Sequence, residues 1–173
     1  AARGGVPASC GTPKDAQLRC AVDVWGGPRR RGVFQLGMWT DAGPSASLSP
    51  ERMRAVVRPK AYGAWPLHEA TRERALDCFV MFSSVSSIFG NPAQGNYSAA
   101  NAFVDALAHH RQALGLPALT VNWGVLGGEG YVARNERVAE FLARQVTMGI
   151  TPGEALALLE SFLTAGADQE IAV

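Results

Sequence analysis

The sequence has few charged residues and no long hydrophobic run. Charged residues make up 18% of the 173 residues, and they sum to a net charge of +1. Soluble domains usually have roughly 25% charged residues. No apolar stretch approaches the roughly 18–20 residues that a membrane span needs, and no secretory signal pattern is evident. Near-zero net charge argues against nucleic-acid binding. We therefore expect a globular cytoplasmic domain that binds neither nucleic acid nor membrane.

Cysteine and lysine are also scarce. The three cysteines form no CxxC pair and the three histidines have no zinc spacing, so we predict neither a disulfide framework nor a metal site. Cys78 lies in an apolar run, which indicates a buried small hydrophobic residue. Lys14 and Lys60 are the only lysines among the 16 basic residues. A coding bias toward arginine explains the scarcity of lysine. The alternative is that Lys60 has a function, which its spacing from other residues would have to indicate.

The first 31 residues differ in composition from the rest. They contain six basic and two acidic residues, and eight of them are glycine or proline. A short strand at Ala21–Trp25 is conceivable, but Gly26, Gly27 and Pro28 would end it. We therefore divide the chain into an atypical, loop-rich or poorly ordered segment, 1–31, and a second unit, 32–173.

From Gly32 onward, predicted strands and helices alternate. Helix boundaries come from N-cap patterns at Ser49 and Thr151, from Gly115 as a C-cap, and from Pro59, which should break or kink its helix. This alternation predicts an α/β fold, a Rossmann-like parallel sheet flanked by helices. The first strand is expected to begin at 32 and to be followed by a loop by 37. Further strands are expected at 76–82, 118–123 and 170–173. The helices are expected at 50–57, 64–71, 99–114, 135–145 and 151–163.

Polar residues follow the strand predicted at 76–82. Ser83–Ser87 should form a loop at its carboxyl end, where such sheets bind ligands. Tyr97 and Asn101 are four residues apart and therefore share one face of the next helix. This pattern is typical of an acid–base site, although a tyrosine at a helix start is more often a packing residue with a hydrated hydroxyl.

Three longer motifs resemble a known family. Phe-Ser-Ser-Val-Ser-Ser (82–87) precedes Gly-Asn-Pro-Ala-Gln-Gly-Asn-Tyr-Ser-Ala-Ala-Asn-Ala-Phe (90–103), and Gly-Leu-Pro-Ala-Leu-Thr-Val-Asn-Trp-Gly follows at 115–124. Together they resemble the ketoreductase domains of modular polyketide synthases, which belong to the short-chain dehydrogenase/reductase superfamily. Segments 48–53 and 59–69 extend the resemblance, so that 32–173 is similar to the C-terminal catalytic portion of such a domain.

The resemblance implies a catalytic set. Lys60, Ser84, Tyr97 and Asn101 follow one another at separations of 24, 13 and four residues, as the family pattern expects. Tyr97 would donate a proton to the substrate carbonyl oxygen, and Ser84 would donate a second hydrogen bond to it. Lys60 would stabilise the phenolate and bind the nicotinamide ribose. Asn101 would hold Lys60 or a relay water in place.

The resemblance also implies a cofactor, a substrate and partners. The expected cofactor is NADPH, and the substrate is a β-ketoacyl thioester carried by the phosphopantetheine of an acyl carrier protein among other polyketide synthase domains. Residues 124–145 would form a lid with hinges at Gly127, Gly128 and Gly130, or else a plain surface loop. The residues expected to contact the cofactor are Gly37, Lys60, Tyr97, Trp123, Gly124 and Val125.

The chain departs from the family pattern at its N-terminal side. It has no Thr-Gly-x-x-Gly-x-x-Gly turn to hold the cofactor's diphosphate and no basic residue for the 2′-phosphate. We therefore expect an incomplete sheet without the N-terminal cofactor-binding βαβ half. The chain is then an NADPH-dependent reductase portion, a non-catalytic remnant or scaffold piece, or a reductase completed by a neighbouring chain.

Three smaller departures concern stereochemistry and the loop after the first strand. The family's His-x-Ala-Gly is Gln35-Leu36-Gly37-Met38 here, and its Leu-Asp-Asp signature is Thr40-Asp41-Ala42. The tryptophan that marks the opposite stereochemical class, eight residues before the tyrosine, is Phe89. These residues lean toward the Leu-Asp-Asp class.

Overall fold

The computed structural model describes residues 32–127, 149–165 and 169–172. The strand considered at 21–25, the helix expected at 135–145 and most of the expected lid lie outside these ranges. No helix within them is long and apolar enough to cross a membrane.

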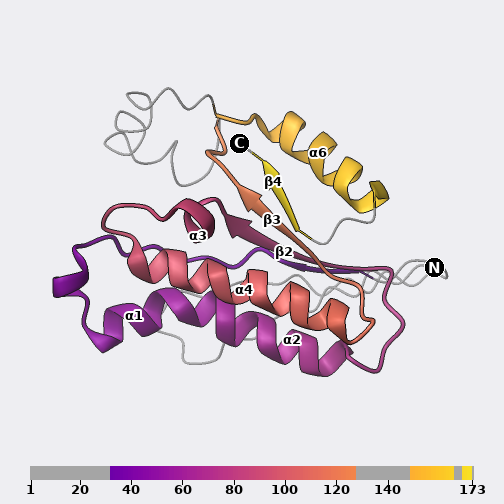
Figure 1. Ribbon diagram of the computed structural model, residues 1–173, viewed down its shortest axis with the longest axis horizontal. Helices are drawn as coiled ribbons and strands as arrows, with labels where there is room; N and C mark the ends of the chain where they lie inside the picture. The colour runs from indigo at the N-terminus through magenta and orange to yellow at the C-terminus, as the bar shows by residue number, and fades with distance from the viewer. Residues whose placement is uncertain (1–31, 128–148, 166–168, 173) are drawn as a thin grey trace, which may run out of the picture.

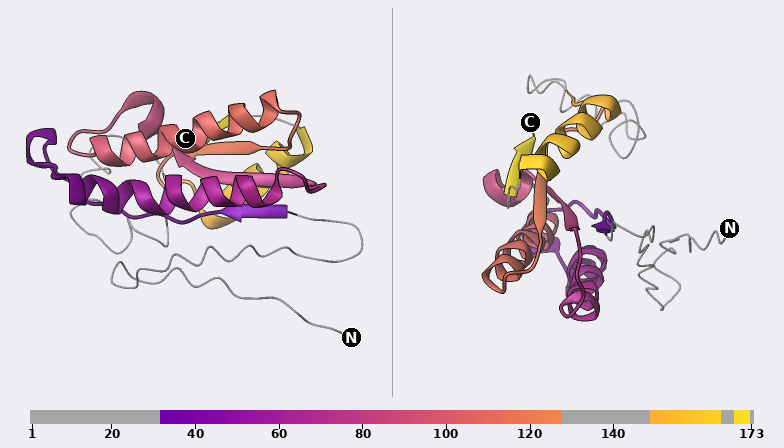
Figure 2. Two further views of the ribbon diagram at one scale, coloured as in Figure 1. Left: turned by 90° about the horizontal axis from the view of Figure 1, so that it is seen from below. Right: turned by 90° about the vertical axis from the view of Figure 1, so that its right-hand side faces the viewer.

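The described residues form a four-stranded parallel sheet with the order β1-β2-β3-β4 (Figure 1). Helices α1, α2 and α4 cover one face and α6 covers the other, as Figures 1 and 2 show. This arrangement confirms the predicted Rossmann-like α/β class. The strands are β1 (Gly32–Gln35), β2 (Cys78–Ser84), β3 (Leu119–Trp123) and β4 (Gln169–Ala172). The helices are η1 (Ser45–Ser47), α1 (Pro50–Val57), η2 (Arg58–Tyr62), α2 (Gly63–Thr71), α3 (Ser86–Phe89), α4 (Gly95–Ala113) and α6 (Pro152–Ala165).

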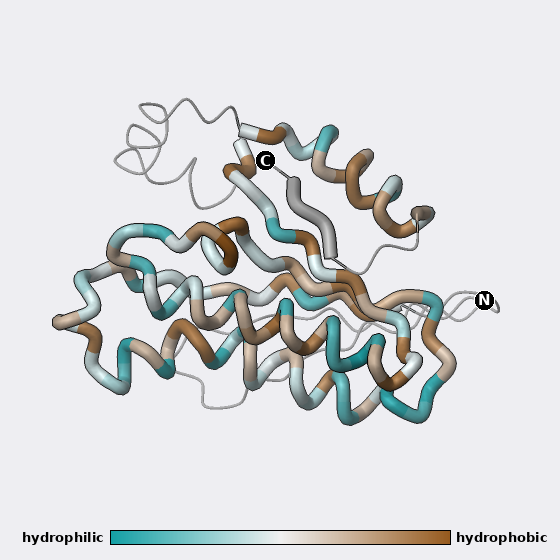
Figure 3. The backbone as a smooth tube through the Cα atoms, in the orientation of Figure 1, coloured by the Kyte–Doolittle hydropathy of each residue, from teal (hydrophilic) through white to brown (hydrophobic). Residues whose placement is uncertain are grey.

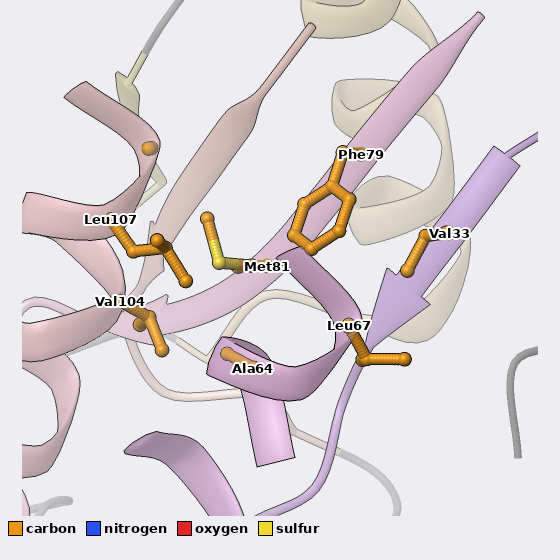
Figure 4. Packing of buried hydrophobic residues seen from close by; sticks show 8 residues of the cluster. Val33, Ala64, Leu67, Phe79, Met81, Val104 and Leu107 are labelled. Carbon is orange, nitrogen blue, oxygen red and sulfur yellow. The ribbon is translucent and has the colours of Figure 1, made fainter. Parts of the chain in front are cut away.

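Successive side chains of β2 point to opposite faces of the sheet and so build two apolar cores. Phe79 and Met81 face α2 and α4, where they join Val33, Leu67 and further residues (Figure 4). Val80 faces α6 and packs in a second cluster with residues of β3 and α6. Figure 3 shows hydrophobic residues along β2, β3 and α6, the elements that contribute most of this second core. The two cores fix the sheet between its helical layers.

The helix boundaries inferred from capping residues are confirmed. The Ser49 hydroxyl accepts from the backbone N–H of Arg52 at the start of α1. Gly115 has a φ of +71° just after α4, a left-handed conformation that glycine adopts without strain. Thr151 and Glu154 form a reciprocal capping box at the start of α6.

Of the two outcomes expected at Pro59, a break or a kink of the helix, the break does not occur. The chain remains helical from α1 into α2 through η2, a five-residue π-helical turn that contains Pro59 near its start. A proline lacks the N–H that an interior helical position must donate. The wider π turn accommodates the missing hydrogen bond without ending the helix, and such turns are common at functional sites.

Two further boundaries differ around the serine-rich segment. Ser83 and Ser84 belong to β2, because Ser83 pairs with Asn122 and Ser84 with Trp123 in the parallel ladder, while α3 takes up the following serines. Helix α4 starts at Gly95, four residues before the predicted start at Ala99. Tyr97 therefore lies within the first turn of a formed helix.

Strand β1 and Cys78 are less buried than expected. Val33 and Gln35 are buried on the α2 side, whereas Phe34 is 47% exposed on the opposite face. Cys78, at the start of β2, is half-buried. On that face the second core consists of residues from β2, β3, α6 and their neighbours, and Phe34 does not belong to it.

Candidate active site

Lys60 reaches the carboxyl end of the sheet from the π turn η2. Its side chain is 2% exposed, and the ammonium donates a hydrogen bond to the carbonyl of Phe82 near the end of β2. Burial disfavours the charged form and lowers the pKa of Lys60 to about 8, while the negative charge of Asp105 acts in the opposite direction. Lys60 is therefore a cation close to its titration range at neutral pH.

Gln35 and Gly37 connect the loop after β1 to the turn that carries Lys60. The Gln35 amide donates to the carbonyl of Pro59 at 2.8 Å and to that of Gly37 at 3.4 Å. A Cβ at Gly37 would lie 3.2 Å from the Gln35 amide nitrogen and 3.5 Å from the Pro59 oxygen. Glycine at 37 thus leaves room for this close approach of the two segments.

Tyr97, Ser84 and Asn101 come together where β2 ends and α4 begins. Burial raises the pKa of the Tyr97 phenol, and hydrogen bonding to the side chains of Asn101 and Ser84 opposes this shift. The Ser84 hydroxyl accepts from the backbone N–H of Ser86 at 3.2 Å, which holds it at the strand end. Tyr97 is therefore a protonated phenol at neutral pH, with two polar side chains beside it.

Asn101 is fully buried one turn after Tyr97. Its amide nitrogen donates to the Tyr97 carbonyl at 2.8 Å, so the side chain is bound to its own helix. Its Oδ1 is buried and makes no hydrogen bond within the described residues. A buried carbonyl oxygen without a donor costs free energy, so this oxygen is an available acceptor at the site.

Behind this set lies a buried polar network that the sequence pattern did not predict. Asp105 Oδ2 accepts from the Ser87 hydroxyl at 2.6 Å and from the Asn122 amide at 3.0 Å. The same Asn122 amide lies 3.1 Å from the Ser83 hydroxyl. A signal was present, because Asp105 follows Asn101 by four residues on the face of Tyr97. The sequence pattern alone does not show that Asp105 is buried, whereas in the structure it is 9% exposed.

The remaining residues expected near a cofactor lie at the end of β3. The Trp123 side chain is 4% exposed and packs against Phe82, with ring centroids 5.3 Å apart, in the core beneath α6. Gly124 and Val125 follow it and are half-buried, and the Val125 carbonyl accepts from the N–H of Ile150. Of the expected hinge glycines only Gly127 is described, and it packs against Gly149.

The loop that contains Thr40–Ala42 is held by contacts of Asp41 with α1 and α4. Arg52 of α1 makes a bidentate salt bridge to Asp41, with distances of 2.7 and 2.6 Å. The Asn96 amide of α4 donates to the Asp41 carbonyl at 2.9 Å. The Asp41 carboxylate is thus engaged by Arg52 in this structure.

The fold and the position of the polar side chains define the structural class of this protein. A parallel sheet with helices on both faces, and with serine, tyrosine, asparagine and lysine side chains at its carboxyl edge, is a Rossmann-like α/β architecture with its polar groups where such sheets bind ligands. The family model described as KR domain matches residues 9–128. The chain therefore belongs to the KR domain family. The match starts inside the segment 1–31, which composition had set apart.

Known proteins agree with this assignment. Polyketide synthase GfsB of Streptomyces halstedii is 42% identical over 161 residues, which cover 91% of this chain and 3% of that protein. A solved structure titled as A-type ketoreductases from a modular polyketide synthase aligns with a TM-score of 0.76 and 40% identity, over 80% of this chain and 29% of that one.

A more distant structure shows the fold alone. It is the angucycline C-6 ketoreductase LanV with bound NADP, and it aligns at 16% identity with a TM-score of 0.68, over 82% of this chain and 60% of that one. The chain thus spans a small part of the curated relative and under a third of the first solved one.

Proposed function

We propose that this chain is the catalytic portion of an NADPH-dependent reductase that converts a β-ketoacyl thioester on an acyl carrier protein to the β-hydroxyacyl form. The observation that carries the proposal is the grouping of a protonated Tyr97, Ser84 and Asn101 at the sheet edge to which Lys60 also extends. Membership of the KR domain family and relatives named as polyketide synthases support this substrate class. They also support the proposal that the reaction takes place in the cytoplasm among other synthase domains.

The residues present fit the nicotinamide end of a dinucleotide cofactor. Lys60 makes one hydrogen bond among the described residues, to Phe82, and an ammonium has three N–H donors. The buried Oδ1 of Asn101 has no donor there. These groups, with Gly37 and the segment Trp123-Gly124-Val125, would hold the nicotinamide and its ribose. The diphosphate end has no Gly-rich turn in this sequence.

The protein groups then have separate tasks in a ketone reduction. If a reduced nicotinamide is bound here, it would supply the hydride for the carbonyl carbon, and negative charge would then develop on the carbonyl oxygen. Tyr97 donates its phenolic proton to that oxygen as a general acid. Ser84 donates a hydrogen bond to the same oxygen and lowers the energy of the developing charge. The Lys60 cation stabilises the phenolate left on Tyr97.

A pair of tyrosine variants tests the proposal. NADPH binding is measured by fluorescence titration, and turnover by the loss of NADPH absorbance with a β-ketoacyl thioester on a carrier protein. Tyr97→Phe should retain NADPH binding but lose about 10²–10⁴-fold in rate, because the general acid is gone. Tyr62→Phe is the matched control: it also removes a phenolic hydroxyl, but from a tyrosine that is 64% exposed, and it should keep the wild-type rate. A Tyr97→Phe protein with full activity would overturn the assignment.

A second candidate is a non-catalytic remnant or scaffold piece. The observation in its favour is the missing Gly-rich turn, without which this sequence supplies no diphosphate cradle of its own. Saturable micromolar binding of NADPH by the chain would refute the remnant. Absence of binding, with activity restored by a separate chain that carries the N-terminal half, would instead identify a reductase assembled from two chains.

A further inference from the structure

The π turn η2 pairs its backbone differently from the α-helices on either side of it. In an α-helix, the N–H of Gly63 would donate to the carbonyl of Pro59, four residues earlier. At the end of η2 this N–H donates to the carbonyls of Arg58 and Lys60, five and three residues before it. The Pro59 carbonyl receives a hydrogen bond from outside the helix, from the side chain of Gln35 at 2.8 Å.

The orientation of the Gln35 amide follows from its neighbours. Its nitrogen lies within hydrogen-bond distance of two backbone carbonyls, those of Pro59 and Gly37, and a carbonyl only accepts. The amide must therefore present its NH₂ group to them. Its Oε1 is buried and makes no hydrogen bond within the described residues, which costs free energy that an apolar side chain would avoid. The donation to Pro59 is thus what an amide supplies at this buried position.

Two consecutive residues of η2 are bound to two neighbouring strands at the same level of the sheet. Gln35 of β1 pairs with Met81 of β2 in the parallel ladder, one residue before Phe82. Gln35 binds the Pro59 carbonyl, and the Lys60 ammonium donates to the Phe82 carbonyl. Conversion of the π turn to α-helical pairing would rotate the residues on one side of it by about 100° around the helix axis. The position of Lys60 therefore depends on what keeps this turn in place.

We propose that Gln35 is a positioning residue for Lys60: by binding the Pro59 carbonyl, it holds the π turn against the end of β1. This contact keeps the Lys60 ammonium buried at the Phe82 carbonyl. The catalytic meaning of the role rests on the proposed function, in which Lys60 stabilises the phenolate of Tyr97. The placement of Lys60 by Gln35 does not rest on it.

The scarcity of lysine allows a direct measurement of this placement. The chain has only two lysines, so ¹³C labelling of lysine gives two ε-methylene signals, and Lys60→Arg identifies the one from Lys60. In the wild-type protein this signal should titrate at about 8, because burial lowers the Lys60 pKa. Gln35→Met keeps the length and neutrality of the side chain but removes the donor. The Lys60 midpoint should then rise by about one pH unit or more, because the ammonium regains contact with water.

A neutral replacement leaves the charges that act on Lys60 unchanged. The negative charge of Asp105 acts on the Lys60 pKa, and burial raises the pKa of the Tyr97 phenol, which stays neutral over this range. Both groups are the same in Gln35→Met. A shifted midpoint therefore reports where the Lys60 ammonium lies, and not a change of charge around it.

Gln112→Met is the matched control. The Gln112 amide near the end of α4 also donates to a backbone carbonyl at 2.8 Å, that of Ala118, so the variant loses a hydrogen bond of the same kind. It should leave the Lys60 midpoint at about 8. If Gln35→Met does not fold, Gln35→Asn, whose amide is one methylene shorter, provides the comparison. A Lys60 midpoint that does not rise in a folded Gln35 variant, or that rises equally in Gln112→Met, would overturn the proposal.

The titration needs neither cofactor nor substrate, so its outcome is independent of the proposed activity. In the reductase assay, Gln35→Met should lose about 10²-fold in rate, because a small displacement of a catalytic group has effects of this size. Gln112→Met should keep the wild-type rate. A wild-type chain without activity, together with a raised Lys60 midpoint in Gln35→Met, would refute the reductase and support the positioning role.

Discussion

At the scale of single residues, the chemistry of this protein depends on burial. The ammonium of Lys60 is removed from water, which lowers its pKa to about 8. Tyr97 is affected in the opposite sense, since burial raises the pKa of its phenol. A proton donor that stays protonated and a cation that can stabilise its anion are what a carbonyl reduction requires.

A second buried residue, His68, lies away from this site and affects stability. Arg111 has no acceptor atom, so its contact of 3.2 Å requires His68 Nδ1 to accept, which places the imidazole proton on Nε2. Burial is the first cause that lowers the His68 pKa, followed by the positive charge of Arg111. The folded protein therefore favours neutral His68.

The stability of the protein should consequently decrease in acid. Because the folded pKa of His68 lies below the unfolded value, this contribution is complete above pH of about 6.5 and is lost as the pH falls through the folded pKa. Urea unfolding between pH 7.5 and 5 measures the slope. His68→Gln, which retains an acceptor for Arg111, should reduce the slope, while His109→Gln at an exposed position should not. Equal slopes in all three proteins would contradict this account.

At the scale of elements, the helix ends and turns locate the functional groups. The π turn η2 positions Lys60 so that its ammonium donates to the Phe82 carbonyl of β2. Gln35 connects that turn to β1 through its hydrogen bond to the Pro59 carbonyl. The first turn of α4 holds Tyr97 beside Ser84 at the end of β2. Each group therefore comes from a different element, and the parallel arrangement of the strands brings these elements to one edge.

The capping box of α6 gives a prediction at this scale. Thr151 accepts from the Glu154 N–H at 3.3 Å, and Glu154 accepts from the Thr151 N–H at 2.8 Å. Thr151→Ala removes the hydroxyl cap and should lower the free energy of unfolding by about 1 kcal/mol. Thr164→Ala, at the other end of α6, serves as a control with a smaller expected effect, because its hydroxyl bonds carbonyls of the preceding turn. Chemical denaturation compares the two, and equal losses would argue against the cap.

At the scale of the whole molecule, the two apolar cores hold the helices against the two faces of the sheet. Phe79 lies at the centre of the core between β2, α2 and α4 and is fully buried. The Arg111 guanidinium lies 3.8 Å from its ring centre and adds a cation–π contact. Loss of this side chain therefore affects contacts among several elements at once.

Phe79→Ala should lower the free energy of unfolding by about 3–5 kcal/mol, since it removes buried apolar surface and leaves a cavity. Phe89→Ala, at a phenylalanine that is 75% exposed, should change it by less than about 0.5 kcal/mol. Urea titrations of the three proteins, followed by circular dichroism, measure both values. A small loss in Phe79→Ala would mean that the core between the sheet and α2 and α4 does not stabilise the fold as described.

The sequence by itself determined the fold class and the family, and it supplied the residues that we propose as catalytic. Strand and helix alternation is a local pattern, and the spacing of Lys60, Ser84, Tyr97 and Asn101 is visible along the chain. The helix caps at Ser49, Gly115 and Thr151 were equally readable, because capping depends on a few neighbouring residues.

Only the tertiary structure decided what surrounds those residues. The chain continues helically through Pro59, β2 extends to Ser84, and Asp105 is a buried carboxylate that accepts hydrogen bonds from Ser87 and Asn122. The side chain of Trp123 packs into the core beneath α6. These features depend on contacts between segments distant in sequence, and desolvation and long-range fields arise only when such segments pack together.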